Sequence, residues 1–232
     1  MKTLIVTGAS KGIGFAVAQV FLAAGYRVIN LSRTPAPDDA IENHGIDLSL
    51  SDSEEQLREL MELLITDGEI CVVHNAAKMI NDSALDADSD GLRDLFAINV
   101  MAPHILNQAV LPHMQAGSSI IYVGSTLAEK AVANTYSYVI TKHAIVGMMR
   151  STCQDLAGTG IHTACVCPGF TDTEMLRTHV GDDKEVLESI AAASTFGRLV
   201  APKEIADTVY FAAANSVING AVLHANLGQV EH

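Results

Sequence analysis

Short runs of β-branched and other apolar residues alternate along the chain with longer stretches that have helix-like patterns. The short runs predict strands at residues 4–7, 27–32, 45–48, 69–74, 118–124, 161–167 and 221–225. The longer stretches predict helices at 13–24, 51–66, 88–111, 135–157 and 202–214. No linker, repeat or low-complexity tract interrupts this alternation, so we expect a single domain over residues 1–232.

Several predicted strands are apolar without interruption, for example residues 4–6 and 120–123. Strands of this kind are buried on both faces. Where they alternate with helices, right-handed crossovers join them into one parallel sheet. The predicted fold is therefore α/β, a doubly wound, Rossmann-like parallel sheet flanked by helices on both faces. Ligands bind such sheets beyond the carboxyl ends of the strands, and the candidate chemistry should lie there.

The composition narrows the class of protein. Apolar residues make up 49% of the 232 residues and charged residues 18%, which excludes a disordered chain. A net charge of −13 argues against nucleic-acid binding, and no apolar run approaches the ~20 residues that cross a membrane. The four cysteines lack C-x-x-C spacing and the nine histidines lack metal-ligand spacing. We therefore expect free, buried thiols, a cytoplasmic setting and no bound metal.

The first candidate site is the turn Thr7-Gly8-Ala9-Ser10-Lys11-Gly12-Ile13-Gly14. It directly follows the first predicted strand and opens the first predicted helix. Its three glycines let the backbone turn tightly and bring N–H groups onto a phosphate at the helix N-terminus. Any tight turn from strand to helix favours glycine, but at this position the pattern indicates nucleotide binding.

The second candidate is the pair Tyr138 and Lys142, which lie four residues apart on one face of the predicted helix. An ammonium group beside a phenol favours the phenolate, as a general acid and base near neutral pH requires. Such a pair is also an ordinary feature of helix surfaces. Ser125 follows the fifth predicted strand and could hydrogen-bond a substrate carbonyl in the same crevice, or cap a turn.

Together these motifs resemble the short-chain dehydrogenase/reductase family over residues 3 to 228. The glycine turn is similar to that family's cofactor turn, and His74-Asn75-Ala76-Ala77 to its Asn-Ala-Gly segment. Pro168-Gly169-Phe170-Thr171-Asp172-Thr173 is similar to its Pro-Gly-x-x-x-Thr segment. The family's catalytic tetrad is matched in order and spacing by Asn99, Ser125, Tyr138 and Lys142.

The resemblance implies hydride transfer between a nicotinamide and a carbonyl or alcohol carbon. Tyr138 would exchange the proton on oxygen, Lys142 would hold the nicotinamide ribose, and Ser125 would orient the carbonyl. Asn99 would shape its helix and support a water-mediated proton relay to Lys142. The implied cofactor contacts are Gly8, Ser10, Lys11, Gly12, Ile13, Gly14, Ser32, Arg33, Asp47, Leu48, Asn75, Ala76, Ala77, Tyr138, Lys142, Pro168, Gly169, Thr171 and Thr173.

The end of the second predicted strand favours NADP(H) over NAD(H). Where an NAD-selective enzyme of this fold places a carboxylate, this chain has Ser32, followed by Arg33. Lys11 lies in the glycine turn, and two cations that converge on a 2′-phosphate would give charge-assisted hydrogen bonds. The alternative is that Arg33 points into solvent. Asp47 is expected near the adenine, where it should not discriminate between the cofactors.

The substrate is less well specified. We expect the segment 174–197 to close the pocket as a lid, with a mixture of apolar and polar residues that singles out no ketone. Ala77 replaces the family's usual glycine, and His143 stands where alanine is frequent. The residues between the Tyr and the Lys are bulkier than is usual there: Val139, Ile140 and Thr141. None of these departures removes a catalytic group, so they bear on substrate fit.

The predicted function is therefore NADP(H)-dependent interconversion of a carbonyl and a secondary alcohol on a small molecule. Two alternatives stand beside it: a catalytically retired dinucleotide-binding regulatory module, and a non-redox enzyme on the same scaffold, such as a dehalogenase or epimerase. Family members usually assemble through two long helices, here 88–111 and 135–157. We expect a homodimer or homotetramer, with no nucleic-acid or membrane partner, although the apolar residues of these helices would also serve packing on the sheet.

Overall fold

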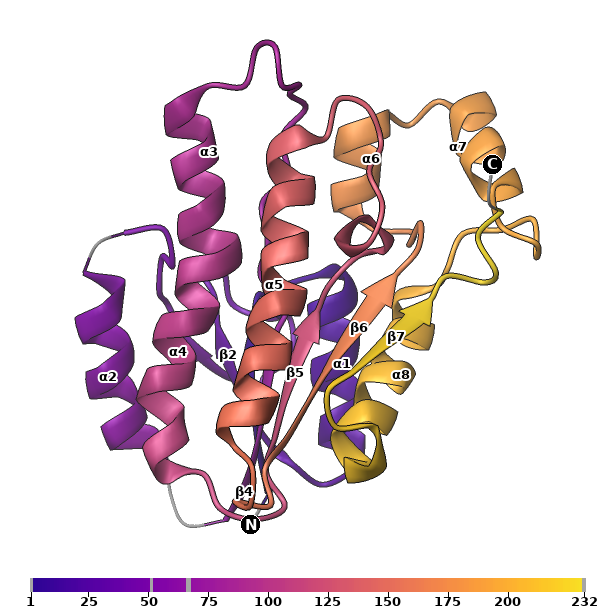
Figure 1. The fold of residues 1–232 in the computed structure, drawn as a ribbon. Helices are drawn as coiled ribbons and strands as arrows, with labels where there is room; N and C mark the ends of the chain where they lie inside the picture. The colour runs from indigo at the N-terminus through magenta and orange to yellow at the C-terminus, as the bar shows by residue number, and fades with distance from the viewer. Residues whose placement is uncertain (1, 51, 66–67, 231–232) are drawn as a thin grey trace.

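The strands form one parallel sheet at the centre of the fold (Figure 1). The structure, a computed structural model, describes residues 2–50, 52–65 and 68–230. Within these ranges the strands are β1 (Lys2–Thr7), β2 (Arg27–Leu31), β3 (Glu42–His44), β4 (Glu69–His74), β5 (Ser119–Val123), β6 (His162–Pro168) and β7 (Ala221–Ala225). They pair in parallel in the order β3-β2-β1-β4-β5-β6-β7. The order reverses between β1 and β4, as in a doubly wound sheet, so the predicted fold class is confirmed.

Helices cover both faces of this sheet (Figure 1). The α-helices are α1 (Gly12–Ala23), α2 (Ser53–Leu64), α3 (Ser89–Phe96), α4 (Ala102–Val110), α5 (Tyr136–Asp155), α6 (Glu174–Val180), α7 (Lys184–Ala192) and α8 (Pro202–Ala214). Side chains of a strand point alternately to opposite faces. Leu4 and Val6 of β1 accordingly pack in the core beneath α1 and α8, whereas Ile5 packs in the core beneath α2, α4 and α5. Helices α6 and α7 lie beyond the carboxyl edge of the sheet.

One strand prediction was wrong. The third strand is Glu42–His44, not residues 45–48. The Asn43 side chain accepts hydrogen bonds from Asn30 Nδ2 (2.9 Å) and from the backbone N–H of Ala36 (2.8 Å), which fixes this edge of the sheet. Ile46 and Leu48 lie in the loop that follows β3, and their side chains are buried. These two apolar residues produced the apolar pattern from which a strand was predicted.

Helix boundaries also differ in places. The predicted helix 51–66 is observed as α2, and its predicted end residues, Ser51 and Thr66, lie outside the described residues. The predicted helix 88–111 divides into α3, a wider π-helical turn η1 (Ala97–Met101) and α4, and ends in the 3-10 turn η2 (Leu111–His113). Two further 3-10 turns are η3 (Thr126–Ala128) and η4 (Ser216–Ile218).

The helical stretch Ser89–His113 is long and apolar enough, by length and composition alone, to cross a membrane. In the fold its inner side chains Leu106 and Val110 are fully buried in the core. Two of its polar side chains, Asn99 and Asn107, are also buried, and both make hydrogen bonds with other elements. This pattern of burial is typical of a helix that packs against a sheet in the core of a protein.

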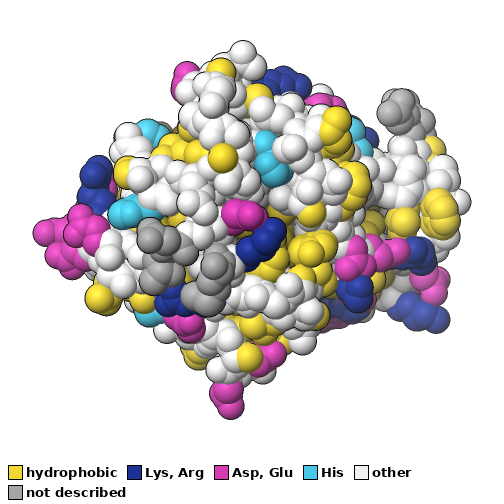
Figure 2. Space-filling view, turned by 90° about the horizontal axis from the view of Figure 1, so that it is seen from below, with side chains coloured by type: hydrophobic (Ala, Val, Ile, Leu, Met, Phe, Trp, Pro, Cys, Tyr) yellow, Lys and Arg dark blue, Asp and Glu magenta, His cyan; other side chains and the backbone are white. Residues whose placement is uncertain are grey.

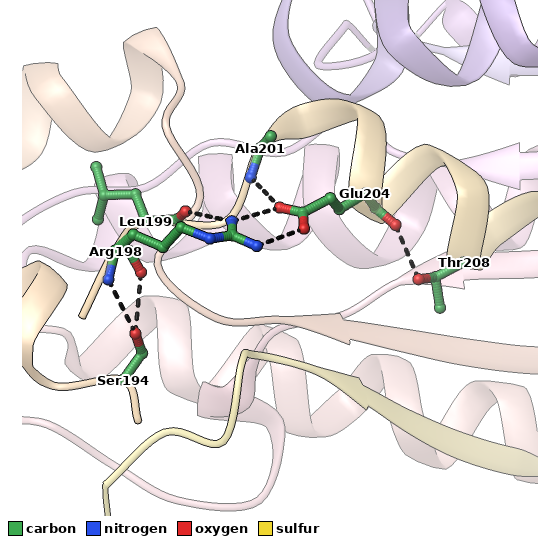
Figure 3. A network of polar contacts seen from close by, with 6 residues as sticks. All are labelled: Ser194, Arg198, Leu199, Ala201, Glu204 and Thr208. Carbon is green, nitrogen blue, oxygen red and sulfur yellow. Dashed lines mark hydrogen bonds and ion pairs between the residues drawn. The ribbon is translucent and has the colours of Figure 1, made fainter. Parts of the chain in front are cut away.

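An exposed polar network fixes the return from α7 to α8 (Figure 3). Arg198 forms a bidentate ion pair with Glu204 at 2.7 and 2.8 Å, and the same carboxylate accepts the backbone N–H of Ala201 at 2.8 Å. The Arg198 hydrogen bonds, with the help of Ala201, lower the pKa of Glu204 to about 2. The Ser194 hydroxyl donates to the Arg198 carbonyl oxygen at 2.9 Å and accepts the Arg198 backbone N–H at 3.4 Å. The end of the predicted lid is thereby tied to the first turn of α8.

Most basic side chains of the described chain are paired with carboxylates. Examples are Lys2 with Glu69 and Arg27 with Glu42, both at 2.7 Å. Figure 2 shows the face that lies below the fold in the view of Figure 1. The Lys and Arg side chains visible there are scattered and form no continuous basic area among the described residues.

The four cysteines are free thiols. Three of them are buried, and Cys153 is only partly buried. Burial raises the pKa of the Cys71 thiol to about 12.

Candidate active site

A cavity of about 1060 Å³ opens at the carboxyl edge of the sheet. Because β1, β4, β5 and β6 are parallel, the residues that follow them meet at this edge. The predicted site residues that line the cavity are Gly8, Ser10, Lys11, Gly12, Ile13, Ser32, Arg33, Asp47, Leu48, Asn75, Ala76, Ala77, Ser125, Tyr138, Lys142, Pro168, Gly169, Thr171 and Thr173. Two others, Gly14 and Asn99, are not part of its lining.

The glycine turn needs glycine at two kinds of position. Gly8 and Gly12 have φ of 73° and 58°, in the left-handed region that side chains disfavour. Gly14 lacks room instead: a Cβ there would lie 2.2 Å from the Gly8 carbonyl oxygen and 2.5 Å from Asn75 Nδ2. Lys11, which precedes α1, provides no side-chain cap for its first N–H groups. The backbone at this helix start fits a phosphate.

Asn75 ties the end of β4 to this turn. Its Nδ2 donates to the carbonyl oxygens of Thr7 and Gly8, both at 3.0 Å. The Thr7 hydroxyl in return accepts the backbone N–H groups of Asn75 and Ala76, both at 3.0 Å. Asn75 therefore holds the shape of the glycine turn, a structural task that the sequence did not indicate.

The two cations expected at a 2′-phosphate are each paired with a carboxylate. Arg33 Nη1 lies 3.9 Å from Asp47 Oδ2, and its side chain is 73% exposed. Lys11 Nζ lies 2.5 Å from Glu174 Oε1 on α6, and its side chain is 62% exposed. The Ser49 hydroxyl and backbone N–H donate to the Asp47 carboxylate and lower its pKa.

Three of the four predicted catalytic side chains meet in the cavity wall. Tyr138 and Lys142 are 8% and 4% exposed, and Lys142 Nζ lies 5.4 Å from the centroid of the Tyr138 ring. Lys142 Nζ donates to the Val123 carbonyl oxygen at 2.8 Å, which leaves two of its three protons for other acceptors. Ser125 Oγ accepts the backbone N–H of Leu127 at 3.1 Å. Ser125 thus caps η3 and also lines the cavity, and no acceptor in the described part of the chain takes its own proton.

Asn99 lies in η1, buried behind the wall. Its Oδ1 accepts the Lys78 N–H at 2.8 Å, and its Nδ2 donates to the Lys78 carbonyl oxygen at 2.9 Å and to Thr141 Oγ1 at 3.0 Å. Thr141 in turn donates to the Tyr138 carbonyl oxygen at 2.9 Å. Asn99 therefore connects the segment after β4 to the turn of α5 that carries Tyr138.

A second buried network begins at His74, the last residue of β4. His74 Nε2 donates to Asn107 Oδ1 at 2.8 Å, and Asn107 Nδ2 donates to the Tyr122 hydroxyl at 2.7 Å. Burial lowers the pKa of His74 to about 4, so its ring is neutral at pH 7. This network joins β4, α4 and β5.

A comparison with known families shows to which family this chain belongs. The family model described as enoyl-(acyl carrier protein) reductase matches residues 8–229. The chain belongs to the short-chain dehydrogenase/reductase family. It is therefore an oxidoreductase with a nucleotide-binding Rossmann fold.

Relatives and solved structures agree over nearly the whole chain. The 3-oxoacyl-[acyl-carrier-protein] reductase of Escherichia coli (strain K12) is 30% identical over 98% of this chain and 96% of its own. A short chain dehydrogenase family protein from Francisella tularensis superposes with a TM-score of 0.89 at 26% identity, over 98% of each chain. Angucycline C-6 ketoreductase LanV with bound NADP superposes with a TM-score of 0.86 at 27% identity, over 98% of this chain and 95% of its own.

Proposed function

We propose that this protein transfers hydride between NADP(H) and the carbon of a carbonyl or secondary alcohol, with Tyr138 as general acid and base. The observation that carries this proposal is the meeting of Tyr138, Lys142 and Ser125 in the wall of the cavity that the glycine turn opens into. When bound, the dinucleotide supplies the hydride at its nicotinamide ring. The residues of the chain supply position, a proton and electrostatic stabilisation.

In the direction of reduction, the Ser125 hydroxyl donates a hydrogen bond to the substrate oxygen and stabilises the negative charge that develops on it. Tyr138 then delivers its phenolic proton to that oxygen. The Lys142 ammonium group, 5.4 Å from the ring centroid, stabilises the phenolate that remains. Its two free protons are available to the ribose hydroxyls of the cofactor. Asn99 and Thr141 support this arrangement from behind the wall.

The chain also fits the rest of the dinucleotide. The left-handed Gly8 and Gly12 and the start of α1 would hold the pyrophosphate. Pro168, the last residue of β6, and Gly169, Thr171 and Thr173, which follow it, line the cavity and would flank the nicotinamide. The segment 174–197, with α6 and α7, would serve as the lid of a single-domain enzyme.

Ser32 and Arg33 support NADP(H) as the preferred cofactor. Ser32 places no carboxylate at the end of β2, so a 2′-phosphate meets no repulsion there. Arg33 and Lys11 hold their carboxylate partners only through exposed contacts, which are individually weak. A dianionic phosphate would compete well for both cations. LanV, with NADP bound, is a relative of the same fold.

We expect kcat/KM to be about 10- to 100-fold higher with NADPH than with NADH, because one or two charge-assisted hydrogen bonds are gained. Arg33→Ala should lower kcat/KM for NADPH and leave that for NADH nearly unchanged. Steady-state kinetics with both cofactors measures these values. Equal or better turnover with NADH would refute the preference for NADP(H).

The apolar part of the cavity lining supports an apolar, small-molecule carbonyl or alcohol as substrate. Met175, Leu176 and Ile190 belong to it from the lid, and Met79, Leu127 and Val132 belong to it from other segments. Burial lowers the pKa of His179, which lines the cavity from the lid. The printed name of the Escherichia coli relative adds 3-oxoacyl thioesters to the candidates. We further propose a cytoplasmic homodimer or homotetramer that assembles through α3–α4 and α5.

A further inference from the structure

Asp82 joins the loop after β4 to the start of α5. It is 8% exposed and lines the cavity. Its Oδ1 accepts the backbone N–H of Ser137 at 3.0 Å, and its Oδ2 accepts the Ser137 hydroxyl. The Asp82 backbone N–H donates to the Asn134 carbonyl oxygen at 3.3 Å, and its carbonyl oxygen accepts the Tyr136 N–H at 3.2 Å. Four hydrogen bonds therefore connect Asp82 to the three residues 134, 136 and 137, and Tyr138 follows directly.

The start of α5 depends on Asp82 because it has no cap of its own. The residue before the helix, Thr135, donates its hydroxyl to the Val132 carbonyl oxygen at 2.7 Å and caps none of the first N–H groups. Helix starts leave such N–H groups without partners inside the helix. Asp82 accepts two of them, those of Tyr136 and Ser137, and its carboxylate also matches the positive end of the helix dipole.

The segment that contains Asp82 also contacts the other parts of the site. Asn75, at its start, holds the glycine turn, and Lys78, in its middle, bonds to Asn99 at both backbone groups. Asp82, at its end, holds the first turn of α5. Residues 75–82 thus connect the cofactor turn to the helix that presents Tyr138, and Asp82 is their last link.

We propose that Asp82 is a positioning residue for Tyr138, which acts through Ser137 and the backbone at the start of α5. The inference rests on the proposed function. Tyr138 is the third residue of α5, so a first turn that frays or rotates moves its phenol relative to Ser125 and the nicotinamide. A misplacement of about 1 Å can slow an enzymatic reaction about 100-fold.

The competing interpretation is an ordinary helix cap that stabilises the fold alone. Asp88 provides a control of this kind. Its Oδ2 accepts the backbone N–H of Gly91 at 2.8 Å and caps the start of α3. Asp88 is exposed and is not part of the cavity lining. Both aspartates therefore support a helix start, but Asp82 supports the helix that carries Tyr138.

The experiment compares Asp82→Ala, Asp82→Asn, Ser137→Ala and Asp88→Ala with the wild-type enzyme. Sites that bind NADPH are counted by fluorescence titration, so that kcat refers to folded, cofactor-competent protein. Turnover of a ketone is then measured with NADPH and with NADPH deuterated at the transferred position. A loss of folded protein changes the number of sites but neither kcat per site nor the isotope effect.

For Asp82→Ala we expect kcat per site to fall about 10- to 100-fold, the KM for NADPH to stay within about threefold, and the isotope effect to rise as hydride transfer becomes slower than the other steps. Asp82→Asn should restore most of kcat, because its Oδ1 can accept the Ser137 N–H and its amide can donate to the Ser137 hydroxyl. Ser137→Ala should show a smaller change in the same direction. Asp88→Ala should stay within about twofold of wild type.

Wild-type kcat per site and an unchanged isotope effect in Asp82→Ala, with only a lower Tm, would overturn the inference. If Asp82→Ala does not fold, Ser137→Ala decides, and an unchanged kcat and isotope effect in that variant would overturn it. If the wild-type enzyme turns over a ketone while these variants behave as described, the role of Asp82 is overturned and the proposed function is not. A wild-type protein that turns over no carbonyl compound would overturn both.

Discussion

Replacing Tyr138 with phenylalanine should lower kcat by a factor of about 10³, within the range that a general acid–base group contributes. The substitution removes only the phenolic hydroxyl and keeps the ring beside Lys142. Hydride transfer then leaves a negative charge on the substrate oxygen with no proton to neutralise it. NADPH binding should change by less than about threefold, because the glycine turn, Arg33 and Lys142 are intact. Steady-state oxidation of NADPH and a fluorescence titration with NADPH measure the two quantities.

Tyr136→Phe is the control for this variant. Tyr136 lies two residues earlier on α5, is 41% exposed, and has Ile140 rather than a cation four residues on. We expect its kcat to match the wild-type value closely. Retention of more than a few per cent of wild-type kcat by Tyr138→Phe would show that another group transfers the proton.

Gly14→Ala should damage both stability and cofactor binding. The new Cβ would lie 2.2 Å from the Gly8 carbonyl oxygen and 2.5 Å from Asn75 Nδ2, and those two atoms are hydrogen-bonded to each other. Neither can move without a shift of the glycine turn. Overpacking of this kind lowers the free energy of unfolding by about 1–3 kcal/mol. In a chain of this size that corresponds to a fall in Tm of about 2–12 °C.

A displaced turn also presents its N–H groups poorly to the pyrophosphate, so the Kd for NADPH should rise at least about tenfold. Gly45→Ala is the matched control, since an added Cβ there meets no atom within 4 Å and the backbone is not in the left-handed region. Thermal unfolding and NADPH titration of both variants test the prediction. Gly14→Ala with wild-type Tm and wild-type Kd would show that α1 does not pack as described.

The sequence predicted the central strands well because burial on both faces makes them apolar throughout. It misplaced β3, because an edge strand of three polar residues, Glu42–His44, has no apolar pattern to detect. The buried Ile46 and Leu48 nearby gave a false signal. The helices α6 and α7 were not predicted within the lid, because each is short and has no buried residue.

The candidate site was predictable wherever a residue belongs to a motif at the end of a strand, as Ser125 and Asn75 do. Its supporting contacts were not, because they join residues far apart in the chain. Asp82 bonds to Ser137 across 55 residues, and Asn99 to Thr141 across 42. A hydrogen bond of this kind leaves no periodic pattern in the sequence. The carboxylate partners of Lys11 and Arg33 were missed for the same reason.

Oxidation of NADPH by the purified wild-type protein, with a panel of ketones, diketones, quinones and 3-oxoacyl thioesters, tests the assignment of an active reductase most directly. We expect at least one carbonyl compound to be reduced at a steady rate proportional to enzyme concentration, with kcat of at least about 1 s⁻¹. Tight binding of NADPH without turnover of any carbonyl compound would contradict that assignment and indicate a dinucleotide-binding regulatory module.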